Sequence, residues 1–194
     1  RGADAGRGKG PPHPRGDERP GKMVRPGNAP GGGAGYGDYI FKTVGRLDQL
    51  DRNLIFGLFI WEYQESYAGH ETRNVANGFD IEFSRWKDPR RLPAQFVCQP
   101  WQNPGNEHRF DLRLKNEQSK VSHAFLWQAG GVSCRSWRGH ADQPSPRTLI
   151  HEWLYDGPDN PRTEAPRVHL NLWCMEAPPS DGLEAREARS EEPR

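Results

Sequence analysis

The sequence predicts an all-β protein, built as a sandwich of two antiparallel sheets. From Tyr36 onward, short runs rich in aromatic and β-branched residues alternate with clusters of Gly, Pro, Asn and Asp. No segment in this part keeps a helical period between capping residues. Many short strands with turn signals between them are typical of a sandwich or a barrel.

Nine runs are the expected strands, and two of them indicate how the layers lie. Residues 54–61, Leu-Ile-Phe-Gly-Leu-Phe-Ile-Trp, are apolar on both faces, as in a strand that is covered on both sides. Residues 79–84, Phe-Asp-Ile-Glu-Phe-Ser, alternate, so their apolar side chains point one way and their polar ones the other. The nine expected strands are residues 38–45, 53–63, 78–86, 94–101, 107–114, 121–128, 131–138, 148–155 and 167–175.

The two ends of the chain differ from this central part. Residues 1–34 are about half Gly and Pro and hold seven Lys/Arg against three Asp/Glu. Such a stretch buries too little apolar surface to offset its conformational entropy. We therefore predict a disordered basic tail over 1–34, one β-sandwich domain over 35–179 and a charged tail over 180–194.

Charge and hydropathy limit the classes of partner. Residues 35–194 hold twenty Lys/Arg against twenty-three Asp/Glu, so the basic excess belongs to the first tail, where a solvated leader is favoured over a nucleic-acid arm. No run approaches the ~20 apolar residues that span a bilayer. We expect a monomer with no nucleic-acid or membrane partner. No signal-peptide pattern follows Arg1, and the sequence does not indicate a compartment.

Three cysteines, Cys98, Cys134 and Cys174, leave at least one thiol unpaired. Each lies in an apolar or alternating run, which favours buried free thiols. A single disulfide bridge is the alternative.

Asp80 and Glu82 are the candidate chemical groups. Alternate side chains of a strand lie ~6.6 to 7 Å apart on one face, so each carboxyl group raises the proton affinity of the other. A protonated carboxyl beside an ionised one suits general acid catalysis at a glycosidic oxygen. Taken alone, the spacing also fits an ordinary solvent-facing pair.

The surrounding residues resemble a known family. The run Gly78-Phe-Asp-Ile-Glu-Phe-Ser-Arg-Trp86 is similar to the catalytic strand of family-16 glycoside hydrolases, the laminarinase and lichenase type, whose pattern is E-x-D-x-E. The resemblance is closest to the short bacterial branch. It continues, in order and spacing over roughly residues 35–182, in Gly35-Tyr-Gly-Asp-Tyr-Ile-Phe, Gly57-Leu-Phe-Ile-Trp61, Ser122-His-Ala-Phe-Leu-Trp127 and His169-Leu-Asn-Leu-Trp173.

The resemblance implies a concanavalin A-like jelly roll whose concave face carries a polysaccharide cleft. In that reading Glu82 is the acid/base and Asp80 the assisting residue. The resemblance also implies that His123, Trp127, Asn171 and Trp173 border the cleft, with Trp86 and Trp101 just past strands at its rim. The alternatives are that a single Trp packs in the core and that a lone His is structural.

The chain departs from the family pattern at the nucleophile position, which is Gly78. A retaining glycosidase needs a carboxylate there to form the covalent intermediate. Glu71, Glu107 and Glu152 could replace it, although the spacing favours none of them. The strands that the family has before the first of these segments and after the last are replaced here by Gly/Pro-rich and charged sequence.

We therefore expect a polysaccharide-active protein whose hydrolysis of β-glucan-type chains is weak or lost. A non-catalytic, lectin-like module and a diverged structural or interaction domain are the alternatives. The histidines lack metal-ligand spacing, so we expect no catalytic metal and no cofactor.

Overall fold

The computed structural model describes residues 35–62, 77–161, 166–175 and 189–190. The tail predicted at 1–34 lies outside the described residues, as does Glu71. The elements are β1 (Gly37–Val44), η1 (Leu47–Gln49), β2 (Leu54–Glu62), β3 (Gly78–Phe83), β4 (Ala94–Cys98), β5 (Glu107–Phe110), β6 (Lys120–Gln128), β7 (Gly131–Arg138), β8 (Leu149–Tyr155), β9 (Pro166–Cys174) and β10 (Arg189–Ser190).

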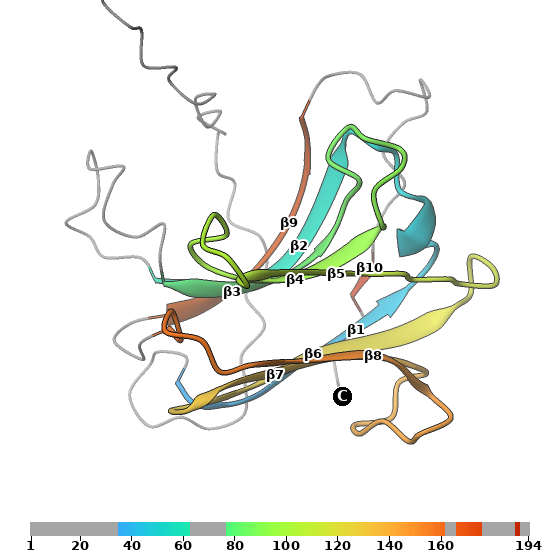
Figure 1. Cartoon of the computed structure of the whole chain (residues 1–194). Coiled ribbons are helices and arrows are strands. Elements are labelled where there is room, and N and C mark those ends of the chain that lie inside the picture. The colour runs from blue at the N-terminus through green and yellow to red at the C-terminus, as the bar shows by residue number, and fades with distance from the viewer. Residues whose placement is uncertain (1–34, 63–76, 162–165, 176–188, 191–194) are drawn as a thin grey trace, which may run out of the picture.

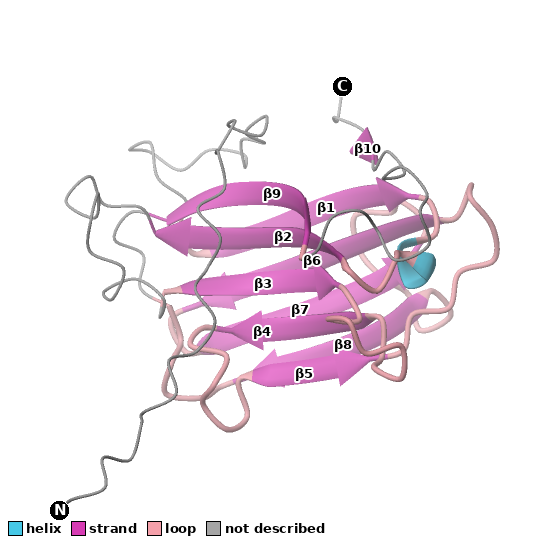
Figure 2. Ribbon diagram, turned by 90° about the horizontal axis from the view of Figure 1, so that it is seen from above, coloured by secondary structure: helices cyan, strands magenta, loops and turns pink. Residues whose placement is uncertain are grey.

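Two antiparallel five-stranded sheets form the jelly-roll sandwich, which confirms the predicted fold class (Figures 1 and 2). The front sheet has the order β5-β4-β3-β2-β9, and the back sheet has the order β10-β1-β6-β7-β8. All nine expected strands are present. The short β10 is a difference, because it pairs with β1 at Thr43 and Val44 although no strand was expected in the charged C-terminal stretch.

The core lies between the sheets and is strongly aromatic. The front sheet contributes Phe79, Ile81 and Phe83 from β3, all fully buried, as the alternating pattern predicted. Phe125 and Trp127 of β6 face them from the back sheet and are also fully buried. Ring contacts join the layers, with Phe79 and Phe125 centroids 6.3 Å apart. This packing fixes which side chains of β3 face outward.

The edge strands β5 and β8 face each other across the open side of the sandwich. His108 of β5 and His151 of β8 point inward, and their Nε2 atoms lie 2.7 Å apart. Their rings stack at 5.0 Å, and Trp153 lies 5.6 Å from the His108 ring. Partial burial lowers the pKa of both imidazoles. This pair is the polar link between the two sheets at this edge.

The three cysteines are free thiols, as the sequence predicted for at least one of them. Cys98 and Cys134 are buried, while Cys174 is partly exposed. No bridge joins them. Among the described residues, no helix is long and apolar enough to cross a membrane.

Candidate functional site on the front sheet

Asp80 and Glu82 lie on the outward surface of the front sheet, which we call the front face. Because Phe79, Ile81 and Phe83 fill the core, the intervening carboxyl groups of β3 must point the other way. Asp80 is nevertheless only 5% exposed, and Glu82 is partly buried. Both carboxyl groups are therefore held largely out of water.

Neutral amides contact the two carboxyl groups. The Gln99 amide donates a hydrogen bond to Asp80 Oδ2, and the Gln95 amide donates one to Glu82 Oε2. Burial raises the pKa of Asp80, against the smaller opposing effect of Gln99. Burial also raises the pKa of Glu82, and the neighbouring charge of Asp80 raises it further. The pair thus holds protons at pH values where free carboxyl groups have lost them.

The row of residues beside Glu82 runs across the whole front sheet. Gln95 of β4 and Arg109 of β5 follow on one side, while Gly57 of β2 and Asn171 of β9 follow on the other. Arg109 lowers the pKa of Glu82 by its positive charge, although less than burial raises it. Gln95 Oε1 and Arg109 Nη1 are buried without a hydrogen-bond partner. These two atoms are available to a bound polar molecule.

Gly57 allows the Asn171 side chain to lie beside Glu82. A Cβ atom at position 57 would lie 2.6 Å from Asn171 Oδ1, so any larger residue would displace that amide. Phe59 of β2 pairs with Asp80 in the sheet, and its ring stacks on that of His169 of β9 with centroids 5.0 Å apart. The front face therefore combines acids, amides and aromatic rings.

Two tryptophans expected at the cleft lie together at the Glu82 end of the front face. Trp173 pairs with Ile55 in the sheet and has the same outward orientation as Asn171, two residues before it. Its ring meets that of Trp86 edge-on, with centroids 6.0 Å apart. Beyond the other end of β3, Trp101 is 53% exposed, and its backbone N–H donates to Gln99 Oε1. The structure thus brings Asp80, Glu82, Asn171, Trp173 and Trp86 to one face.

His123 and Trp127 do not lie on this face, which corrects the expectation that they border the cleft. Both are fully buried on the inward side of β6, in the other sheet. His123 Nδ1 lies 2.8 Å from Ser136 Oγ, and its Nε2 lies 3.2 Å from Thr43 Oγ1. Burial lowers the pKa of His123 to about 3, so the ring is neutral. His123 is therefore a structural histidine and Trp127 a core tryptophan, as the alternatives in the sequence analysis had it.

Position 78 lacks a carboxylate and is also sterically closed. A Cβ atom there would run into the backbone carbonyl oxygen of Ile60 on β2. Of the possible replacements, Glu152 lies on the back sheet, where it pairs with Arg135. Glu107 does lie on the front face, but Arg109 holds it in an ion pair. Among the described residues, no group of three or more His, Cys, Asp or Glu is placed to hold a metal ion.

The sequence analysis missed Gln95, Gln99 and Arg109. A signal for Gln95 existed, because it is the one polar residue in the run Ala-Gln-Phe-Val-Cys at 94–98, which is the next expected strand after β3. An antiparallel neighbour would place its outward polar residue beside Glu82. Arg109 lies two strands from Glu82, and only the sheet order reveals that relation.

Comparisons with solved structures find β-glucanases and a glycosidic hydrolase. The chain matches the Bacillus licheniformis beta-glucanase at 22% identity (TM-score 0.44), with 75% of this chain and 56% of that chain covered. It matches a beta-1,3-1,4-glucanase (lichenase) from a mouse hindgut metagenome at 21% identity (TM-score 0.44), with 75% and 56% covered. A native glycosidic hydrolase matches at 20% identity (TM-score 0.48), with 81% and 63% covered.

The chain thus spans less than two thirds of the length of the solved structures that it matches. No protein-family model matches the sequence, and no curated protein matches it. The fold assignment itself comes from the strand order and register described above.

Proposed function

We propose that the chain binds a polysaccharide on its front face, and that hydrolysis of the family-16 β-glycosidase kind is slow or lost. The observation that carries the proposal is the convergence of Asp80, Glu82, Asn171 and Trp173 on one face from β3 and β9, the two strands that flank β2. Acids and amides bind sugar hydroxyl groups, and indole rings pack against the C–H faces of sugars. The Trp86–Trp173 pair and exposed Trp101 would supply such rings.

Glu82 is the residue that would deliver a proton to a glycosidic oxygen. Its raised pKa keeps it protonated near neutral pH, as a general acid requires. The Gln95 amide orients its carboxyl group. The first step of a retaining mechanism also needs a carboxylate nucleophile on the opposite face of the sugar ring, and Gly78 supplies none. We expect slow hydrolysis because Glu82 can donate a proton, but no carboxylate at position 78 can attack the sugar.

Hydrolysis assays test the missing nucleophile. We expect the protein to release little or no reducing sugar from lichenan or laminarin. Azide is a small nucleophile that needs no side chain at position 78, so azide-dependent formation of a glycosyl azide would reveal an otherwise working site. Hydrolysis at ordinary enzyme rates without azide would refute the proposed loss and require another nucleophile.

A Gly78→Glu variant tests the same point, with Gly78→Ala as the matched control. Both variants force β3 away from the Ile60 carbonyl group, but only the first adds a carboxylate. Activity of Gly78→Glu above that of Gly78→Ala would support a weakened glycosidase. If neither azide nor Gly78→Glu gives activity while polysaccharide still binds, the non-catalytic, lectin-like alternative holds.

Binding assays test the front face directly. We expect Trp101→Ala and Trp173→Ala each to weaken retention in a β-glucan affinity gel by about fivefold or more, since each removes a stacking ring. Leu154→Ala is the control, because Leu154 is 67% exposed on the back sheet. If the unmodified protein binds no polysaccharide in the gel or on a glycan array, the structural-domain alternative replaces this proposal.

A further inference from the structure

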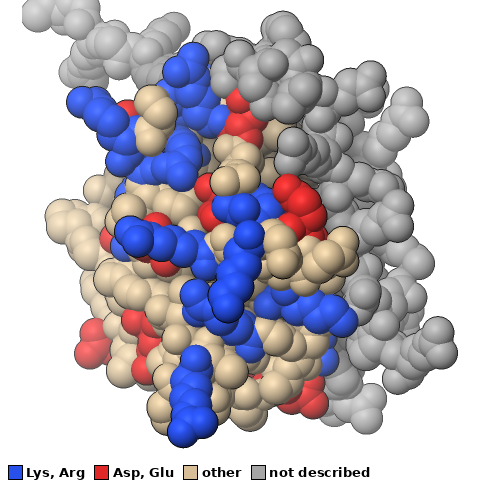
Figure 3. Space-filling view, turned by 90° about the vertical axis from the view of Figure 1, so that its right-hand side faces the viewer, with Lys and Arg blue, Asp and Glu red and all other residues tan. Residues whose placement is uncertain are grey.

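One end of the sandwich is strongly basic. Four loops meet there, namely residues 45–53, 84–93, 111–120 and 138–148, and we call them the basic end. They hold eleven Lys/Arg against six Asp/Glu. The rest of residues 35–62, 77–161 and 166–175 holds four Lys/Arg against eight Asp/Glu. Figure 3 views this end and shows Lys and Arg side chains spread across it.

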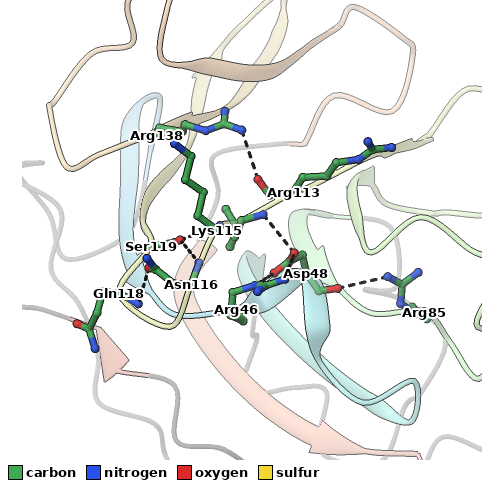
Figure 4. A network of polar contacts seen from close by, with 10 residues as sticks. Arg46, Asp48, Arg85, Arg113, Lys115, Asn116, Gln118, Ser119 and Arg138 are labelled. Atoms are coloured by element: carbon green, nitrogen blue, oxygen red, sulfur yellow. Dashed lines mark hydrogen bonds and ion pairs between the residues drawn. The ribbon is translucent and has the colours of Figure 1, made fainter.

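Buried Asp48 fixes three of these loops to one another (Figure 4). Arg46 donates to both of its carboxylate oxygens, at 2.8 and 2.9 Å. The Leu114 N–H donates to Asp48 Oδ2 at 3.2 Å, and Arg85 donates to the Asp48 backbone carbonyl at 3.3 Å. The fourth loop joins through Arg138, which donates to the Arg113 carbonyl at 3.3 Å. The backbone that carries the cations is therefore held in place.

Several cations of the basic end remain available to a ligand. Arg85 is occupied with loop carbonyls, and Arg46, Arg90 and Arg113 have carboxylate partners. Within the part of the chain that the structure describes, no ion pair engages the following exposed side chains: Arg52, Arg91, Lys115, Lys120 and Arg147. The Ser119 hydroxyl accepts from the backbone N–H groups of Lys115 and Asn116, which fixes the turn between two of them.

We propose that the basic end is a second binding surface, which takes an anionic polysaccharide with about one carboxylate or sulfate group per sugar. Because the loops are already held in place, their cations can bind such a polymer with little loss of loop conformational entropy. Exposed acids such as Asp111 and Glu117 are interspersed with the cations. They would repel duplex DNA, which carries one charge per ~1.7 Å, more than a sparsely charged glycan.

Polygalacturonate is the probe, and fully methyl-esterified polygalacturonate is its uncharged counterpart. We expect the acid form to bind the full-length protein in 50 mM salt and to be released at 500 mM, because salt screens exposed charges. The ester should not bind. Equal binding of acid and ester would overturn the proposal, as would no binding of the acid form. Tighter binding of duplex DNA than of polygalacturonate would assign the surface to nucleic acid instead.

Two double variants with the same change in net charge locate the surface. Lys115→Gln/Lys120→Gln removes two unpaired cations of the basic end and should weaken polygalacturonate binding by about fivefold or more. Arg135→Gln/Arg167→Gln removes two cations of β7 and β9, outside the basic end, and should change polygalacturonate binding less than twofold. Equal losses in both would mean that only net charge matters, against the proposal. Trp173→Ala should leave this binding intact, which separates the basic end from the front face.

Discussion

Asp80 reduces stability whenever its carboxyl group is ionised, because it is 5% exposed and its hydrogen-bond partner, the Gln99 amide, carries no charge. Its pKa is raised in the folded protein, so the folded state binds a proton more tightly than the unfolded chain does. The associated stability is therefore fully present below about pH 4 and is lost as pH rises through the folded-state pKa.

We predict that Asp80→Asn raises the free energy of unfolding at pH 9 by on the order of 2 kcal/mol and changes it little at pH 4. The asparagine oxygen still accepts from Gln99, and no charge has to be buried. Removing the charge should also lower the pKa of Glu82, which Asp80 raises. Urea denaturation at the two pH values measures the first effect. Asp38→Asn, at an exposed position of β1, is the control. It should leave the free energy of unfolding unchanged at both pH values.

Residue-level interpretation of the sequence was right for β3 and wrong for β6. In β3 three aromatic or branched side chains alternate with polar ones, so the buried side of the strand could be predicted. In β6, His123 and Trp127 also share a face, but the pattern does not tell whether that face is inward. Their burial depends on Phe79 and Phe83 packing against them from the other sheet. These contacts come from a strand of the other sheet, so the residue pattern of β6 alone could not predict them.

We predict that Trp127→Ala lowers the free energy of unfolding by about 3–5 kcal/mol, since it leaves a large cavity between the sheets. Thermal denaturation measures the loss. Trp101→Ala, which truncates an exposed ring, should cost less than about 1 kcal/mol and is the comparison. Equal costs for the two variants would contradict the assignment of Trp127 to the core.

At the scale of elements, strand existence was predictable, but strand order was not. Each of the nine runs has its own local signal, and each forms a strand. The pairing of β2 with both β3 and β9, distant in sequence, brings Glu82 and Asn171 together across Gly57. Only the family resemblance linked those segments before the structure did. The edge contact between β5 and β8, with its two histidines, had no signal in either strand.

The edge strands should make stability depend on pH. Both imidazoles have a lowered pKa, so the unfolded chain binds protons more readily, and stability falls as pH drops below about 6.5. We predict that the free energy of unfolding falls less between pH 7 and pH 5 in His151→Gln than in the unmodified protein. The glutamine keeps a polar partner for His108 but cannot gain a proton. Denaturation midpoints at the two pH values test this. An unchanged loss would contradict a contribution from His151 and would leave His108 and His123, whose pKa values are also lowered, as the sources.

At the scale of the whole molecule, cations concentrate at the basic end, while the rest of residues 35–62, 77–161 and 166–175 holds more Asp/Glu than Lys/Arg. The basic end carries the excess of cations, and the front face carries the buried acids. A long polymer with scattered negative groups would be drawn to the basic end over distances near the Debye length, about 10 Å at 0.1 M salt. Charge at the basic end and ring stacking at the front face would thus serve separate ligands.

Burial shields two of the three thiols, Cys98 and Cys134, from oxidation. Burial raises the pKa of Cys98 to about 12 and also raises that of Cys134, so neither forms the reactive thiolate at neutral pH. With no bridge to reduce, we predict equal melting temperatures with and without dithiothreitol. A lower value in the reductant would reveal a disulfide. The fold of the described residues therefore does not depend on a disulfide bond.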